Sequence, residues 1–203
     1  MDREDRRLVS RSVAGDQAAF GALYDRHASR IYHLLRRLSG NDTEAEDLTQ
    51  ETFLAAYRAL PNWRGEGALG TWLCGIAVRL QANAYRRRCG HETEYLDEAL
   101  EVPDVSADPL LHCTREEAQR RIHDAIGALP HPYRAVFLLV KVEGLSYREA
   151  AECLEVPLGT VQSRLWRAVG LLQVALQDLA EPGCSRQQTA VSRQSGAVME
   201  PER

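Results

Sequence analysis

The sequence predicts an all-α protein of two small helical domains joined by an acidic, flexible linker. Apolar residues recur at spacings of three and four in the segments 16–39, 43–60, 68–88 and 114–142, which is the period of an amphipathic helix. No segment shows the alternation that would indicate a sheet. Residues 91–110 carry seven carboxylates and two prolines without Lys or Arg, which favours an extended chain.

The chain has 203 residues, a length that suggests one or two domains, each able to bury a core without disulfides or a metal ion. We expect domains at 1–90 and 114–181, a linker at 91–113 and a disordered tail at 182–203. No apolar run approaches the roughly 18 to 20 residues of a membrane span, and the charged N-terminus is unlike a signal peptide. These features predict a cytoplasmic protein.

The cysteines indicate reduced thiols rather than a disulfide framework or a metal site. The five cysteines include no C-x-x-C pair, and the nearest two are 15 residues apart in sequence. We therefore expect no metal and no other cofactor.

The first domain begins with an amphipathic helix over 16–39, which ends at Ser39-Gly40-Asn41. Thr43 and Glu46 have the spacing of a capping box, which predicts that the next helix starts there and runs to Pro61. A loop over 62–67 precedes a helix from about residue 68 to 88.

The helix that follows Thr43 combines acidic and apolar residues. We expect Leu48 and Phe53 to be exposed among Glu44, Glu46, Asp47, Gln50 and Glu51. Such a face can dock on a basic protein surface. A solvated helix face explains the composition as well, and both interpretations are open.

Aromatic and basic residues alternate between Trp63 and Arg88. Trp63-Arg64 is followed by Trp72, and residues 79–88 contain four Arg without a carboxylate. Flat side chains that stack on bases, together with guanidinium groups that follow the backbone, suit single-stranded DNA. In the alternative interpretation the tryptophans are core anchors, and the last arginines are a basic helix C-terminus favoured by the macrodipole.

Residues 144–168 have the pattern of a helix-turn-helix. Ser146 and Glu149 form a capping box, Val156 can fill the turn, and Pro157 suits the first position of the next helix. Val161 and Leu165 would face inward. The outward groups could enter a major groove or hold phosphates, whereas an ordinary hairpin would only solvate them; these groups are Thr160, Gln162, Ser163, Arg164 and Arg167.

In this order, the motifs resemble the sigma-70 family of bacterial RNA polymerase sigma factors, in particular the extracytoplasmic function (ECF) type that keeps only regions two and four. The resemblance covers roughly residues 10–178. It is carried by the segments 16–24, 45–53, 63–77 and 157–165.

The resemblance implies a sigma factor that binds core RNA polymerase and directs promoter-specific initiation, reading the -35 element as duplex and the -10 element as melted DNA with one base flipped out. It also implies an anti-sigma factor as regulator, and a linker that threads toward the RNA exit path. The residues implied to face the polymerase clamp are Asp47, Leu48, Gln50, Glu51 and Phe53. Those implied for the -10 element are Trp63, Arg64, Trp72, Arg79, Asn83, Arg86 and Arg87. Those implied for the -35 element are Arg148, Thr160, Gln162, Ser163, Arg164 and Arg167.

Two alternatives compete with this interpretation. An autonomous helix-turn-helix regulator would normally dimerise on paired half-sites, and its task does not call for the aromatic and basic residues of the first domain. An enzyme is disfavoured because the sequence has neither a nucleophile elbow nor a glycine-rich phosphate loop.

The net charge of -4 argues against nucleic-acid binding only when the whole chain is averaged. Residues 91–110 carry -7, so the remaining residues carry +3. This positive charge is concentrated at Arg79–Arg88 and along the second helix of the helix-turn-helix. The distribution fits a protein that binds DNA weakly until polymerase joins it.

Overall fold

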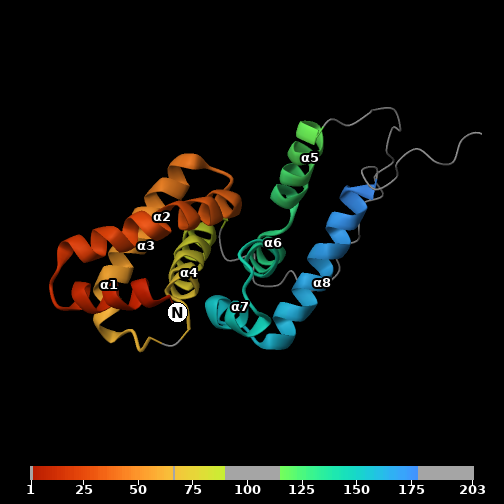
Figure 1. Cartoon of the computed structure of the whole chain (residues 1–203). Helices are drawn as coiled ribbons and strands as arrows, with labels where there is room; N and C mark the ends of the chain where they lie inside the picture. Colours follow the sequence, from red (N-terminus) through yellow and green to blue (C-terminus); the bar gives the residue numbers. More distant parts are fainter. Residues whose placement is uncertain (1, 66, 90–114, 178–203) are drawn as a thin grey trace, which may run out of the picture.

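A computed structural model describes residues 2–65, 67–89 and 115–177, and these residues form helices and connecting turns without a strand (Figure 1). The predicted all-α class is confirmed. The linker and the tail lie outside the described residues. The first block comprises α1 (Arg3–Val13), α2 (Gln17–Ser39), α3 (Asp42–Ala59), the short helix η1 (Leu60–Asn62) and α4 (Leu69–Cys89). The second block comprises α5 (Arg115–Ala128), α6 (His131–Phe137), the π-helical turn η3 (Leu138–Val142), α7 (Tyr147–Leu154) and α8 (Leu158–Ala175).

Helix α2 is the central element of the first block, and its limits agree with the prediction. The Asp16 side chain caps its start by accepting a hydrogen bond from the Ala19 amide at 3.1 Å. Gly40 ends it in the left-handed conformation, with φ of 73°. Its apolar stripe is buried against α1, α3 and α4.

The predicted capping box at Thr43 is wrong. Helix α3 starts earlier because Asn41, in extended conformation, accepts a hydrogen bond from the Glu44 amide at 3.0 Å. Asn is as good an N-cap as Thr, and here it directly follows the glycine that ends α2. The two helices are therefore joined by a tight turn.

Helix α1 was not predicted from the sequence. Leu8 is its main buried apolar residue, and polar contacts fix the helix to α2. Asp5 is buried and accepts from Arg26 at 3.2 Å, and it lies 3.3 Å from the His27 ring nitrogen. A helix held largely by ion pairs has little apolar periodicity, which is the signal that the prediction used.

The helix-turn-helix is formed by α7 and α8. The capping box is confirmed, because the Ser146 hydroxyl accepts from the Glu149 amide and the Glu149 carboxylate accepts from the Ser146 amide. Glu155 makes the turn with φ of 55°. Pro157 is the N-cap rather than the first helical residue, so that prediction was wrong by one position. Helix α8 has 18 residues.

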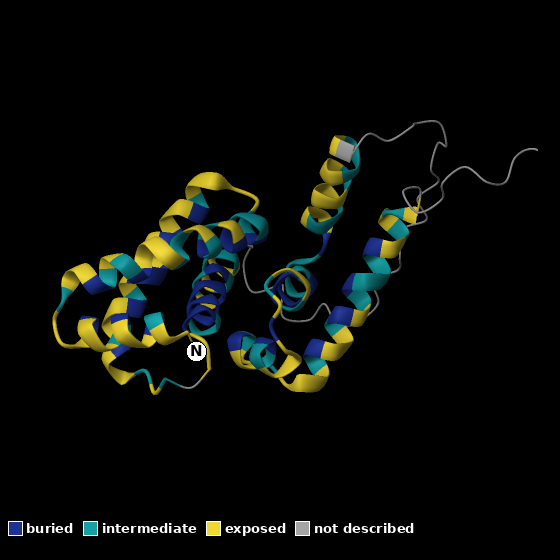
Figure 2. Cartoon of the chain, in the orientation of Figure 1, coloured by how far each residue is buried: buried dark blue, intermediate teal, exposed yellow. Residues whose placement is uncertain are grey.

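The two blocks pack on each other. Helices α4 and α7 lie side by side, and one continuous apolar core contains Leu73 and Val78 from α4 together with Leu138 and Leu139 from the second block (Figures 1 and 2). None of the described helices combines the length and the apolar character that a membrane crossing requires.

Candidate nucleic-acid and protein interfaces

Helix α4 carries most of the residues predicted to bind single-stranded DNA. Trp72, Ile76, Arg79, Asn83 and Arg86 follow one another at spacings of three and four, so they lie on one side of the helix. We call these five residues the α4 stripe. Its three polar members are exposed and Ile76 is buried, and Arg86 donates a hydrogen bond to the Asn83 side chain. The stripe thus offers an aromatic ring, an amide and two cations along one line.

The two tryptophans combine both roles considered for them. Trp63 and Trp72 are partly buried and pack on the core. Their ring centroids are 5.6 Å apart, with an angle of 34° between the ring planes. The neighbouring Arg64 is exposed. The pair forms an aromatic surface at the N-terminal end of the α4 stripe, and the core beneath holds both rings in place.

The arginines at the end of α4 divide into two groups. Arg88 is tied into the first block, because it pairs with Glu44 at 2.7 Å and lies 5.9 Å from the centre of the Tyr85 ring. Arg86 and Arg87 are exposed in the last turn. The helix macrodipole favours cations there, and Arg86 and Arg87 remain the best placed to meet a phosphate backbone.

Helix α8 presents a polar face opposite its buried face. Val161 and Leu165 are buried, as predicted, whereas Gln162 and Ser163 are exposed. Trp166 lies one turn beyond them and is 78% exposed. Sequence reasoning missed this residue because it assigned tryptophans to the first block, although its position four residues after Gln162 places it on the same face.

The other predicted residues of α8 differ in how they are held. Thr160 and Arg164 are partly buried. Arg167 donates to the Tyr133 hydroxyl at 3.3 Å, and this hydrogen bond holds its side chain against α6. Arg164 is a guanidinium in the first half of the helix, so it is better placed than Arg167 to reach a base edge.

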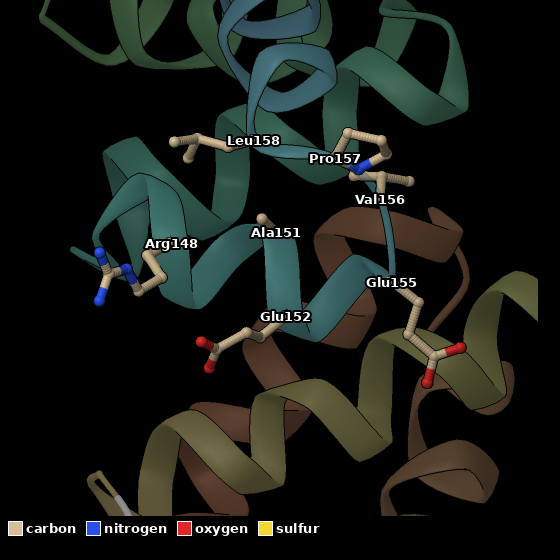
Figure 3. A pocket seen from close by; sticks show the side chains of 7 residues that line it. All are labelled: Arg148, Ala151, Glu152, Glu155, Val156, Pro157 and Leu158. Carbon is tan, nitrogen blue, oxygen red and sulfur yellow. The ribbon is translucent and has the colours of Figure 1, made fainter.

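An open hollow lies between α7 and the start of α8, lined by apolar side chains of the turn (Figure 3). Arg148 and Glu155 mark opposite ends of this hollow, and Glu152 lies between them. The two carboxylates would repel a phosphate, so Arg148 alone gives the rim an anion-binding group. Arg148 is exposed, as a DNA contact requires.

The acidic face of α3 differs from the prediction in its apolar members. Asp47, Gln50 and Glu51 are all exposed, whereas Thr49 is buried. Leu48 and Phe53 are each only 4% exposed, so the expectation that they are exposed is wrong. Both point into the core because the apolar period of α3 is directed toward α2. The exposed aliphatic residue Leu54 lies on this face, at 57%.

Aromatic residues continue this face toward α2. The Phe53 ring packs edge-on against Tyr24 at 4.7 Å between centroids, and Phe20 packs against Tyr57 at 4.9 Å. Tyr24 and Tyr57 remain exposed at the rim of this cluster. Acidic groups beside exposed apolar side chains make a surface that suits a basic protein partner.

Polar contacts join the two blocks at several points. Arg79 of α4 pairs with Glu155 at 2.8 Å, and Arg30 of α2 pairs with Glu143 at 2.6 Å. Two residues after Arg79, the Gln81 side-chain oxygen lies 2.5 Å from the His131 ring, which stacks on Tyr85. Burial, together with the nearby Arg134 and Arg88 charges, lowers the pKa of His131 to about 4.

The described thiols are buried. Burial raises the pKa of Cys74 to about 12 and that of Cys153 to about 11. Both are free cysteines, as predicted. Within the described part of the chain, no group of three or more His, Cys, Asp or Glu side chains could hold a metal ion.

Comparison with known proteins links both blocks to one family. The model for "Sigma-70 region 2" matches residues 23–89, and that for "Sigma-70, region 4" matches residues 119–172. The RNA polymerase sigma-H factor of Pseudomonas aeruginosa is 35% identical over 185 residues, which cover 87% of this chain and 95% of that protein. The ECF RNA polymerase sigma-E factor of Haemophilus influenzae is 36% identical over 185 residues, covering 86% and 96%.

Solved structures show the same architecture. CnrH in complex with the cytosolic domain of CnrY superposes with a TM-score of 0.61 at 25% identity, covering 88% of this chain and 99% of that one. The sigma factor RpoE of Bartonella quintana, in complex with the anti-sigma factor NepR, gives a TM-score of 0.59 at 24% identity, covering 78% and 96%. The second likeness supports the fold alone.

Proposed function

Because this chain belongs to the ECF RNA polymerase sigma factors of the sigma-70 family, we propose that it binds core RNA polymerase and directs initiation at promoters that it reads at two elements. The observation that carries the proposal is the presence of two separate DNA-suited surfaces, the α4 stripe and the polar face of α8, on one chain. A sigma factor acts here by binding energy and needs no catalytic group. The proposed domains are residues 1–90 and 114–181.

The -35 element is read as duplex by α8. Gln162, Ser163 and Trp166 face solvent from its first half, where a recognition helix contacts base edges. Arg164 supplies a guanidinium that can hold guanine O6 and N7. Thr160 and Arg167 support the helix or reach phosphates from its edges, and Arg148 holds the backbone beside the turn.

The -10 element is read as single strand by the α4 stripe. The Trp63 and Trp72 surface stacks on an exposed base, while Arg64, Arg79 and Arg86 follow the phosphates and Asn83 offers a hydrogen-bonding amide. Arg87 extends this basic track. The unpairing of the strand is then stabilised by captured bases rather than driven by a chemical step.

Core polymerase is bound by the exposed face of α3. Asp47 and Glu51 make the polar contacts to the clamp helices together with Gln50, and Leu54 supplies an apolar contact beside them. Leu48 and Phe53 fix the position of this face from beneath. We also extend the proposal to an anti-sigma partner, which the family membership implies.

Run-off transcription from a promoter library tests the proposal. Core polymerase alone should give no promoter-specific transcript, and core polymerase with this protein should select one promoter class. An autonomous regulator would instead protect duplex DNA without polymerase and add no specific transcript, and that result would refute the sigma-factor function.

A further inference from the structure

We propose that helix α1 is a further DNA-binding element, which holds the phosphate backbone of the promoter next to the -10 element. The inference rests on the proposed function, and it extends the DNA-binding surface beyond the α4 stripe. The contact is made by four exposed arginines of α1, which we call the α1 basic face. These residues are Arg3, Arg6, Arg7 and Arg11.

The helical period places the α1 basic face on the side of α1 that points away from the core. The buried residues of α1 follow one another at spacings of three and four and mark the side that packs on the first block; they are Asp5, Leu8 and Ser12. Arg3, Arg7 and Arg11 follow one another at spacings of four on the opposite side. From Arg3 to Arg11 the helix rises about 12 Å, which is the length of about three to four nucleotides along duplex DNA.

Two of the acidic groups near α1 are engaged by α2 and do not neutralise the α1 basic face. Asp2 and Asp5 both accept hydrogen bonds from Arg26 of α2, at 2.6 and 3.2 Å, and these contacts fix the position of the helix. Within the described part of the chain, neither Arg3 nor Arg6 has an ion pair. Both guanidinium groups can therefore bind an anionic partner without losing an existing contact.

The other two arginines of the face hold carboxylates that a phosphate can displace. Arg7 pairs with Glu4 at 2.8 Å, and Arg11 pairs with Asp16 at 2.6 Å. Both arginine side chains are more than half exposed, and exposed pairs contribute only about 0 to 1 kcal/mol. A guanidinium can bind a phosphate through two parallel hydrogen bonds, so the exchange has a small energetic cost.

Helix α1 borders the aromatic end of the α4 stripe. The loop between η1 and α4 carries Trp63, and both ends of this loop lie close to α1 (Figure 1). Helix η1, which ends directly before Trp63, packs against α1. At the other end, the His27 ring lies 3.3 Å from the Asp5 carboxylate and 3.7 Å from the position that a Cβ would occupy on Gly70. Gly70 lies two residues before Trp72, so a strand that passes the two tryptophans meets α1 next.

The composition of the α1 basic face favours DNA over a protein partner. Along the helix from Arg3 to Arg11, all of which the structure describes, no large apolar side chain is exposed. The centre of a protein interface is apolar, and the proposed polymerase-binding face of α3 accordingly exposes Leu54 and Tyr57. A row of guanidinium groups without apolar neighbours suits a row of phosphates.

The salt dependence of promoter binding tests the proposal. Core polymerase with the full-length Arg3→Gln, Arg6→Gln double variant is compared with core polymerase and the unsubstituted protein, on one selected promoter at about 50 and about 200 mM salt. Each phosphate contact adds about 0.7 to 0.9 to the slope of log affinity against log salt. The loss of two contacts should therefore weaken binding about seven to twelve times more at the lower salt concentration than at the higher one. The matched control is Arg3→Lys, Arg6→Lys, which keeps both charges and should keep the slope.

Phosphate ethylation interference locates the contact on the promoter. We expect phosphates next to the -10 element whose ethylation weakens binding of the unsubstituted protein with core polymerase, but not binding of the Arg3→Gln, Arg6→Gln variant. Interference at the -35 element should be the same for both proteins. Arg3 and Arg6 are exposed, so the melting temperature should not change, and each single variant should show about half of the change in slope.

Three results would overturn the proposal. The first is an unchanged salt slope in the Arg3→Gln, Arg6→Gln variant, and the second is a loss of ethylation interference at the -35 element only. The third is a loss of affinity for core polymerase measured without DNA, which would show that the α1 basic face binds a protein. Failure of the proposed function would differ, since core polymerase with the unsubstituted protein would then select no promoter.

Discussion

The Arg79 guanidinium on α4 donates to the Glu155 carboxylate in the turn between α7 and α8, at 2.8 Å. This contact joins two residues that belong to different DNA-reading surfaces. It links the positions of the two surfaces. Measurable consequences arise from this coupling and from the surfaces themselves.

Removing the charge of Glu155 should weaken the contact between the two blocks. In Glu155→Gln the ion pair with Arg79 is lost. An exposed pair of this kind contributes up to about 1 kcal/mol, which is roughly a fivefold change in the equilibrium between packed and separated blocks. Cys153 of α7 lies against Thr71 and Gly75 of α4. We therefore expect the rate of Cys153 alkylation in the free protein to rise by up to about fivefold. Glu152→Gln is the matched control, because it removes an exposed carboxylate three residues away while Arg79 stays paired. Equal rates in the two variants would show that the pair does not hold the blocks together.

The -35 reading surface should depend on Arg164. Arg164→Ala is expected to cost about 1 to 3 kcal/mol and to relax specificity at one -35 position, as measured by run-off selection from a promoter library. Gln173→Ala, at an exposed position farther along α8, should leave the selected sequences unchanged. A uniform loss at all sequences would instead make Arg164 a phosphate contact.

Substitutions on the polymerase-binding face should reduce polymerase binding without reducing the stability of the core beneath it. Asp47→Asn combined with Glu51→Gln should abolish co-purification with core polymerase, and Leu54→Ala should weaken it, without a change in thermal stability because these residues are exposed. Asp25→Asn, an exposed carboxylate on α2, is the control. Unchanged binding in the double variant would remove this face from the interface.

Phe53→Ala, in contrast, should reduce the stability of the protein. Its ring is buried, so the truncation should lower the free energy of unfolding by about 3 to 5 kcal/mol. Chemical denaturation measures this loss. A stable Phe53→Ala protein that no longer binds polymerase would restore the original prediction that Phe53 contacts the partner.

Acid should loosen the packing of the two blocks through His131. Burial and the Arg134 and Arg88 charges lower the pKa of His131 to about 4 where the blocks are packed, against an ordinary value of 6.5. Tyr85, which stacks on the ring, and Gln81 are the other groups against it. A chain in which His131 is no longer buried between the blocks therefore takes up a proton first, so the packing of the blocks is fully favoured above pH 6.5 and weakens as the pH falls toward 4. The radius of gyration from small-angle scattering should rise between about pH 7.5 and pH 5, and should rise less in His131→Gln.

Local signals in the sequence predicted most of the fold. The period of α2, the Ser146–Glu149 capping box and the inward positions of Val161 and Leu165 each depend on neighbours within a few residues, and all three were confirmed. The start of α3 was misplaced because Asn41 and Thr43 both suit an N-cap. Local propensity does not decide between two such residues when both fit the turn.

Features that depend on tertiary packing could not be predicted from the sequence. Leu48 and Phe53 were expected outside because acidic residues surround them, but the packing of α3 on α2 buries both and leaves Leu54 exposed. The contact of Arg79 with Glu155 joins positions 76 residues apart. Nothing in the local pattern of either segment indicates the other, so this contact between the blocks became visible only in the structure.

Permanganate reactivity of unpaired thymines in a selected promoter tests the central claim most directly. Core polymerase with this protein should make thymines of the -10 element reactive, whereas the protein alone and core polymerase alone should not. Asn83→Ala combined with Arg86→Ala should reduce this reactivity. Binding of the protein to duplex DNA without polymerase, with no reactive thymines when both are present, would contradict the account.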